Sequence, residues 1–327
     1  MNLMKPLRDF YSIKVYTNYK EYTLRGSLMK NIRYDFLTKS NIVFAKKREN
    51  RPNNFEDTVK KPLKIYREDC PFCPGNEDES MDEVVEFKNN FGIKIINNKY
   101  PVVSIDEEDN YGHHYVVIED SNHNGDEKTI TQERFFQVLR AYKVAINNIK
   151  KDEKIRYVQI FKNCKRGGGA SLEHPHSQII ALDHIPKKYL ELCGETCDVC
   201  EEREKEENDN LRIVARNNHF IAYAPFASVN AYQIRIALLE HKGSLLDLEG
   251  EVLISLAEIY EKVMSKLRRV LEDFPYNLGF YSLEDENFHF FLDIYPRKIS
   301  LGGFELSSGM LINSKRPEDV ASEINKL

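Results

Sequence analysis

The sequence predicts an α+β fold built from two similar tandem domains, each an antiparallel-rich sheet with packed helices. Three observations carry this prediction. A pattern of cysteines, asparagines and histidines occurs twice in the same order, strand-like runs surround each copy, and each half holds one long helical pattern. A chain of 327 residues also favours two domains over one core.

The first half is predicted to alternate short strands with one helix. Apolar runs bounded by turn residues predict its strands at 34–47, 94–96, 115–118, 157–162 and 177–182. Residues 131–150 carry apolar side chains such as Phe135, Leu139 and Tyr142 at helical spacing, which predicts an amphipathic helix.

The second half is predicted to repeat this order. Its strands are expected at 212–215, 220–224, 234–239, 278–282 and 290–295. A long helix is expected at 248–272, and the glutamate-rich run 201–210 reads as a solvated loop or helix face. With a boundary near 186–195, the predicted units are an extension at 1–30 that could add a strand or hairpin, a first domain at 31–190 and a second at 191–327.

Composition excludes several classes of protein. The net charge of −5 argues against a nucleic-acid coat or a membrane-surface protein. No apolar run approaches the roughly 20 residues of a membrane span. Charged residues near the N-terminus, such as Lys5 and Arg8, lie where a signal peptide would need an apolar core, so a cytoplasmic protein is expected. Four of the six cysteines form CxxC pairs, which in a reducing compartment indicates metal binding rather than disulfides.

Each copy of the repeated pattern holds a complete Cys2His2 set, the usual donor set of a structural zinc site. The two predicted sets are Cys70, Cys73, His123 and His174 in the first half, and Cys197, Cys200, His241 and His289 in the second. The alternatives are buried thiols in a turn for the first pair and a core histidine for His289. Cys193 is an alternative ligand for the second set.

Only the first copy has a histidine two residues after its last predicted ligand. This residue is His176, whereas the second copy has Phe291 at that position, which is expected to pack. In an extended strand, His174, His176 and Gln178 would project from one face. An imidazole whose other nitrogen is held by an acceptor is a competent nucleophile toward phosphorus, which makes His176 the candidate nucleophile.

A glycine turn precedes this strand. Gly168 and Gly169 can adopt positive φ and bring backbone N–H groups close to an anion, which indicates a phosphate site, although a run of glycines can also be only a flexible turn. Three polar side chains could then hydrogen-bond the non-bridging phosphoryl oxygens: Asn163, Ser171 and Gln178.

The segment 161–178 resembles the active-site strand of the galactose-1-phosphate uridylyltransferase branch of the histidine-triad superfamily, and the likeness covers about 34–313. It implies two tandem histidine-triad-like domains, a covalent nucleotidyl-histidine at His176 and a structural zinc ion held by the first set. It also implies that Arg48 and Arg51 bind phosphate, that Asn98 contacts the nucleotide, and that the protein is a homodimer.

Some features resemble the ADP-sugar phosphorylases of this branch more than the uridylyltransferases proper. Ser177 stands where the uridylyltransferases usually have glycine, and the second CxxC set is of the phosphorylase type. Residues 302–313 resemble the phosphorylase pattern and lack the lysine and Tyr-Glu pair that clamp a hexose phosphate in the uridylyltransferases.

The resemblance and the residues together predict a ping-pong nucleotidyltransferase of galactose metabolism. It would take a UDP- or ADP-hexose, form the nucleotidyl-histidine, and pass the nucleotide to a hexose 1-phosphate or to phosphate. The alternatives are an ADP-sugar phosphorylase, a hydrolase or phosphorylase of dinucleoside polyphosphates, and a non-catalytic zinc scaffold or nucleotide sensor.

Overall fold

The computed structural model describes residues 31–50, 64–76, 83–125, 131–297 and 301–326. The predicted extension at 1–30 and the candidate phosphate ligand Arg51 lie outside these residues. Within the described ranges, no helix is both long and apolar enough to cross a bilayer.

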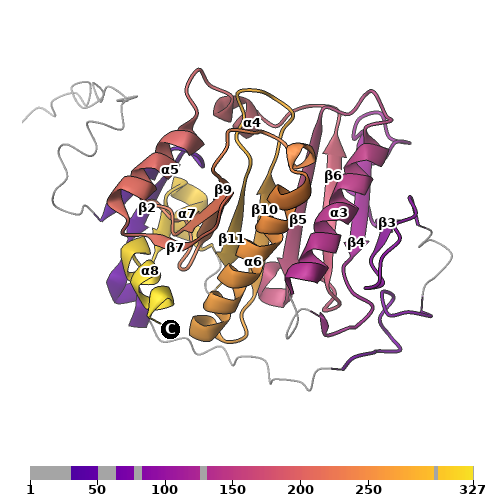
Figure 1. Ribbon diagram of the computed structural model, residues 1–327, viewed down its shortest axis with the longest axis horizontal. Helices are drawn as coiled ribbons and strands as arrows, with labels where there is room; N and C mark the ends of the chain where they lie inside the picture. Colours follow the sequence, from indigo (N-terminus) through magenta and orange to yellow (C-terminus); the bar gives the residue numbers. More distant parts are fainter. Residues whose placement is uncertain (1–30, 51–63, 77–82, 126–130, 298–300, 327) are drawn as a thin grey trace, which may run out of the picture.

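Nine antiparallel strands form the central sheet of the molecule (Figure 1). Their order across the sheet is β3-β4-β6-β5-β10-β11-β9-β8-β7. In that order they span Lys94–Asn97, Gly112–Ile118, His176–Leu182, Tyr157–Cys164, Tyr276–Tyr281, Phe291–Pro296, Ile234–Leu238, Phe220–Tyr223 and Ile213–Arg216. The predicted α+β class with an antiparallel-rich sheet is confirmed.

The two halves of the chain contribute strands in the same order. Four strands of the first half lie as β3-β4-β6-β5, and four of the second half lie as β8-β9-β11-β10. The halves meet where β5 pairs with β10, with Asn163 opposite Asn277. This repeated order is what a duplication would produce, while the domain limits given above stay predictions.

Helices α3 (Gln132–Ile149) and α6 (Gly250–Leu271) cover one face of this sheet (Figure 1). They pack side by side through the stacked rings of Phe135 and Tyr260, whose centroids are 3.8 Å apart. α3 begins where the side chain of Thr131 accepts the backbone N–H of Arg134, a typical N-cap. Because apolar side chains fill this face, polar chemistry in the first half belongs on the opposite face.

A smaller sheet contains β1 (Ile32–Asp35), β2 (Ser40–Phe44) and β12 (Leu311–Asn313), and helices α7 (Gly303–Ser308) and α8 (Pro317–Asn325) flank β12 in the sequence. The prediction of one strand over 34–47 is wrong, because β1 and β2 form a hairpin. The Asp35 side chain accepts the backbone N–H of Leu37 at 3.0 Å and the Thr38 hydroxyl, and Lys39 has a left-handed φ of 53°. These interactions reverse the chain.

Helices α4 (Lys187–Leu192) and α5 (Asp198–Asp209) lie beside the second half of the sheet, with apolar residues in the cluster that covers its other face. The glutamate-rich run predicted to be solvated is therefore part of α5, and only its outer side is exposed. Its Glu202 turns inward and accepts two hydrogen bonds from Arg235 at 3.0 and 2.8 Å.

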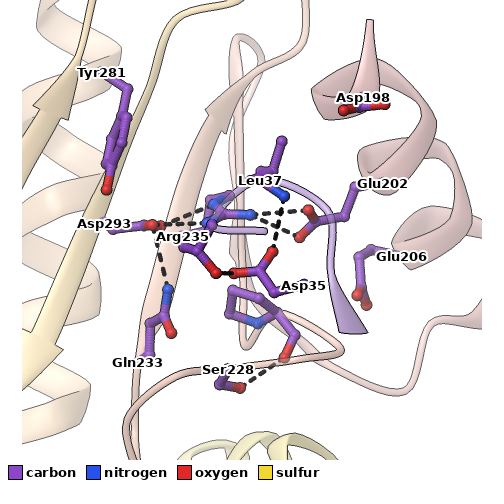
Figure 2. A network of polar contacts seen from close by, with 12 residues as sticks. Asp35, Leu37, Asp198, Glu202, Glu206, Ser228, Gln233, Arg235, Tyr281 and Asp293 are labelled. Carbon is purple, nitrogen blue, oxygen red and sulfur yellow. Dashed lines mark hydrogen bonds and ion pairs between the residues drawn. The ribbon is translucent and has the colours of Figure 1, made fainter. Parts of the chain in front are cut away.

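Arg235 lies at the centre of a closed polar network on this face of the second half (Figure 2). Its side chain is 1% exposed, and it donates to both carboxylate oxygens of Asp293 at 2.9 and 2.7 Å. Asp293 also accepts from Gln233 at 3.2 Å and from the hydroxyl of Tyr295 at 2.8 Å. The charge of Arg235 is thus neutralised by buried carboxylates of the same chain.

Candidate functional site

Four side chains from three segments of the first half converge on one point: Cys70, Cys73, His123 and His174. Their ligand atoms all lie within 4.8 Å of one another, and all four residues are buried. The Sγ atom of Cys73 is 3.5 Å from Nδ1 of His123 and 3.6 Å from Nδ1 of His174. A tetrahedral zinc ion, about 2.3 Å from sulfur and about 2.0 Å from nitrogen, would separate such atoms by about 3.5 Å. This donor set therefore fits a metal ion.

The surroundings of these side chains also suit ligation. Nε2 of His174 donates to the backbone oxygen of Asp120 at 2.7 Å, which leaves Nδ1 as the unprotonated ligand atom. The backbone N–H of Arg67 donates to Sγ of Cys73 at 3.4 Å, which favours a thiolate. Burial raises the pKa of Cys70 to about 11 without an ion, so metal binding must displace a proton there.

The second half repeats this arrangement at a more exposed position: Cys197, Cys200, His241 and His289. Sγ of Cys200 is 3.4 Å from Nδ1 of His241 and 3.2 Å from Nδ1 of His289. The Nε2 atoms of the two histidines donate to backbone oxygens of Glu286 and Leu238 at 2.9 and 2.8 Å. Cys193 belongs to neither of the clusters among the described residues.

The candidate nucleophile His176 is the first residue of β6 and is 6% exposed. Its Nδ1 lies 2.8 Å from the backbone oxygen of His174. Because a carbonyl only accepts, Nδ1 carries the proton and Nε2 is left with its lone pair. The ring of Phe72, between the two cysteines of the first cluster, contacts the rings of His174 and His176 at centroid distances of 6.0 and 5.3 Å. The first cluster is therefore in direct contact with the candidate nucleophile.

The glycine turn connects β5 to the segment that leads into β6. A short 3-10 helix spans Arg166–Gly168, and Gly169 follows with a left-handed φ of 86°. A Cβ atom on Gly168 would lie 2.6 Å from the backbone oxygen of Tyr276 in β10. The turn is thus held against the second half of the chain, and Ser171 beyond it is exposed.

Gly168→Ala is expected to destabilise the protein by about 1–3 kcal/mol, because the methyl group meets backbone that cannot move aside. Urea unfolding measures the change in the free energy of unfolding. Gly303→Ala is the matched control, since a Cβ there has no neighbour within 4 Å. Equal stability of the two variants would contradict the close approach of the turn to β10.

Asn277 was not predicted, yet it organises this part of the site from the second half of the chain. Its side-chain nitrogen donates to Oδ1 of Asn163 at 2.8 Å and to the backbone oxygen of Gly168 at 2.6 Å. With Oδ1 of Asn163 engaged, its own NH2 group is the part left to act as a donor. This link crosses the β5–β10 junction, so no local sequence signal could have shown it.

His114 was also missed, because nothing in the sequence pattern gave it a role. It is buried on β4, and its Nε2 lies 2.9 Å from Oε1 of Gln178 and 3.1 Å from Nδ2 of Asn98. Burial lowers the pKa of His114, which keeps the ring neutral at neutral pH. The structure therefore brings the predicted Asn98 and Gln178 together through a histidine that the sequence analysis did not assign.

The equivalent face of the second half contains no histidine at this position. Phe291 starts β11 as His176 starts β6, and its ring stacks on Tyr281 at 4.2 Å. The guanidinium of Arg235 lies over the same ring at 4.7 Å. Phe291 packs, as the sequence predicted.

Among the residues that the structure describes, Arg48 does not contact those around His176. It is exposed on a 3-10 turn (Lys46–Asn50) after β2, and the backbone before that turn is bonded to Asn313. In Figure 1, β2 lies at the opposite end of the molecule from β3 and β4. Its assignment to phosphate binding stays a prediction.

Residues 20–186 match the family model described as the N-terminal domain of galactose-1-phosphate uridyl transferase. ADP-glucose phosphorylase of Arabidopsis thaliana is 29% identical over 330 residues, which cover 90% of this chain and 92% of the plant protein. Galactose-1-phosphate uridylyltransferase of Thermotoga maritima is 24% identical over 304 residues, covering 82% of this chain and 92% of the relative.

A crystal structure of the Arabidopsis thaliana ADP-glucose phosphorylase with bound ADP-glucose is similar to this fold. The TM-score is 0.77 at 28% sequence identity, and the match covers 90% of this chain and 98% of the plant chain. The similarity therefore extends over both halves of the chain.

Proposed function

Because the chain belongs to the galactose-1-phosphate uridylyltransferase family, we propose that it transfers a nucleoside monophosphate from a nucleotide sugar through a covalent bond to His176. It is a nucleotidyltransferase, as are the named relatives. The observation that carries the residue assignment is the contact between Nδ1 of His176 and the backbone oxygen of His174, which makes Nε2 the unprotonated ring nitrogen.

In the first half-reaction, Nε2 of His176 attacks the α-phosphorus. The nitrogen–phosphorus bond forms as the bond from phosphorus to the bridging oxygen breaks, and the electron pair leaves with the sugar 1-phosphate. Negative charge on the non-bridging oxygens is stabilised by the NH2 groups of Gln178 and Asn163 and by Ser171. The backbone N–H groups of Gly168 and Gly169, which were expected to take part in this step, donate instead to the backbone oxygens of Lys165 and Arg166 within the turn, each at 3.0 Å.

In the second half-reaction, an acceptor phosphate oxygen attacks the same phosphorus and His176 leaves. Its proton stays on Nδ1, hydrogen-bonded to the backbone oxygen of His174, so the ring returns to its starting tautomer. A hexose 1-phosphate acceptor gives a new nucleotide sugar, and inorganic phosphate gives a nucleoside diphosphate. The nucleotide sugar, sugar phosphate and phosphate are the proposed partners of the site.

We assign two structural Zn²⁺ ions to this function, one in each Cys2His2 cluster. Four protein ligands complete a tetrahedral ion and leave no position for substrate, which is the pattern of structural rather than catalytic zinc. Through Phe72, the first cluster also supports the ring of His176.

An ADP-sugar phosphorylase is a specific second candidate within the same chemistry. The higher identity to the plant ADP-glucose phosphorylase, 29% against 24% to the bacterial uridylyltransferase, favours it. Ser177 and the second Cys2His2 cluster, which distinguished the phosphorylase pattern in the sequence, support it too. In this case the acceptor is phosphate.

The test is the intact mass of the protein after incubation with UDP-glucose or ADP-glucose. We expect an acid-labile gain of one nucleoside monophosphate per chain. Adding phosphate or galactose 1-phosphate to the isolated adduct then identifies the acceptor from the nucleoside diphosphate or nucleotide sugar released. Release of free nucleoside monophosphate without an acceptor would indicate a hydrolase, and no adduct with either sugar nucleotide would contradict the proposal.

The homodimer is part of the proposal. α7 and the residues before it expose Phe304, Leu306 and Leu301 by 50%, 73% and 52%, which supports self-association through this segment. Light scattering on the purified protein should give twice the chain mass of 38.3 kDa.

A further inference from the structure

His114 makes two hydrogen bonds whose directions can be deduced. The backbone N–H of Val102 can only donate, and it lies 3.2 Å from Nδ1 of His114. Nδ1 is therefore unprotonated, and in the neutral ring the proton is on Nε2. That proton points to Oε1 of Gln178 at 2.9 Å, while the nearby Nδ2 of Asn98 is a contact and not an acceptor.

These two hydrogen bonds of His114 fix the orientation of the carboxamide group of Gln178. With Oε1 accepting from His114, the other end of the group is the NH2, and among the described residues that NH2 has no hydrogen-bond partner in the protein. Gln178 lies two residues after His176 on β6, so the NH2 is on the same side of the strand as the nucleophile. The reverse orientation would place Oε1 against the phosphoryl oxygens.

The second half contains an equivalent relay, in which one side chain accepts a hydrogen bond from a backbone N–H and donates one to a second side chain, but its residues differ. Gln233 lies directly before β9 and precedes Arg235 by two positions, as His114 precedes Val116 in β4. The registers are equivalent, since Arg235 lies opposite Asp293 and Val116 lies opposite Gln178. Oε1 of Gln233 accepts from the backbone N–H of Val229 at 2.7 Å, and its Nε2 donates to Asp293 at 3.2 Å. His114 and Gln233 are therefore equivalent: each accepts a hydrogen bond from a backbone N–H in a loop and donates one to a side chain on the neighbouring strand, β6 or β11.

We propose that His114 is a positioning residue that holds Gln178 with its NH2 toward the transferred phosphoryl group. The inference rests on the proposed function and adds a residue to it. Loss of the relay is expected to slow formation of the nucleotidyl-histidine about 10- to 100-fold, since a misplacement of about 1 Å near the reacting atoms can cost about 100-fold in rate. The affinity for the nucleotide sugar should change less, since the hydrogen bond from the Gln178 NH2 to the phosphoryl oxygens strengthens as negative charge develops in the transition state.

Three variants separate this role from simple anchoring of the loop at Val102. His114→Gln can donate to Gln178 as Gln233 donates to Asp293, so its rate of adduct formation should stay within a few-fold of wild type. His114→Asn keeps an acceptor near Val102 but is too short to reach Gln178, and it should be as slow as His114→Ala. An asparagine variant as fast as the glutamine variant would overturn the proposal, and so would wild-type rates in all three.

A double-mutant cycle gives the decisive measurement. In single turnovers with the nucleotide sugar that gives the adduct, His114→Ala should have no further effect on the rate in a Gln178→Ala background. Additive losses would overturn the inference. Gln233→Ala is the matched control, since it removes the equivalent relay from the second half, and a rate loss equal to that of His114→Ala would also overturn it. Thermal unfolding checks that each variant is folded.

The same experiment separates the two proposals. A wild-type protein that forms no adduct refutes the proposed function and the inference with it. A wild-type adduct together with additive losses refutes the inference alone.

Discussion

His176→Ala is expected to abolish the nucleotidyl adduct and to lower turnover on the order of 10⁴-fold or more, the loss typical of a removed covalent nucleophile. The physical reason is that, among the described residues of this face, only His176 combines an Nδ1 held by a carbonyl with an unprotonated Nε2 that is not part of the metal cluster. Nδ1 of His174 faces the cysteines, and Nε2 of His114 carries a proton directed at Gln178. Intact mass after incubation with the nucleotide sugar measures the adduct directly.

The control for this variant is His184→Ala. His184 is 70% exposed, and among the described residues its ion-pair partner is its neighbour Asp183 at 2.8 Å, so its removal should leave both adduct and stability unchanged. A His176→Ala protein that still gained a nucleoside monophosphate would contradict the assignment. Peptide mapping of that product would then show which residue is the nucleophile.

Elements with a strong local signal were predicted well from the sequence. The helix expected at 131–150 spans 132–149, because the apolar spacing and the cap at Thr131 are both local properties. The strand that carries His176 was also predicted, since its residues alternate with period two. The hairpin at 32–44 was not, because its turn depends on Asp35 bonding to its own loop, and the apolar residues on either side read as one run.

Two supporting residues of the site had no local signal in the sequence. His114 contacts Gln178 across neighbouring strands, 64 positions apart, and Asn277 contacts Asn163 from the other half, 114 positions apart. The internal repeat offered a signal for His114, because Gln233 is its structural counterpart. The signal was weak, since His114 precedes His123 by nine residues while Gln233 precedes His241 by eight.

Cys73→Ser is expected to remove one of the two proposed metal ions and to lower the melting temperature substantially. Cys73 is fully buried, and its sulfur lies 3.5 and 3.6 Å from the ligand nitrogens of both histidines in its cluster. An ion present at 1,000 times its dissociation constant stabilises the fold by about 4 kcal/mol. For a chain of this size that corresponds to a shift on the order of 10 °C. Elemental analysis and thermal unfolding measure the two effects.

The effect of this variant on catalysis should differ from that of its counterpart Cys200→Ser. Both variants should lose one ion per chain, but only the first cluster contacts His176, through the ring of Phe72. We therefore expect slower adduct formation in Cys73→Ser and a nearly unchanged rate in Cys200→Ser. Equal rate losses in the two variants would contradict a local role for the first cluster and indicate a general loss of stability.

Acid should reduce the stability difference between wild type and Cys73→Ser. Burial raises the pKa of Cys70 and of Cys200 to about 11 and about 12 in the metal-free protein, so ion binding releases protons and weakens as pH falls. The stability that the ion adds is thus present at neutral pH and is lost on acidification, because the wild type then loses the ion as well. Cys193→Ser is the control, since this residue is outside both clusters. A Cys73→Ser protein with two ions and the wild-type melting temperature would refute the first metal site.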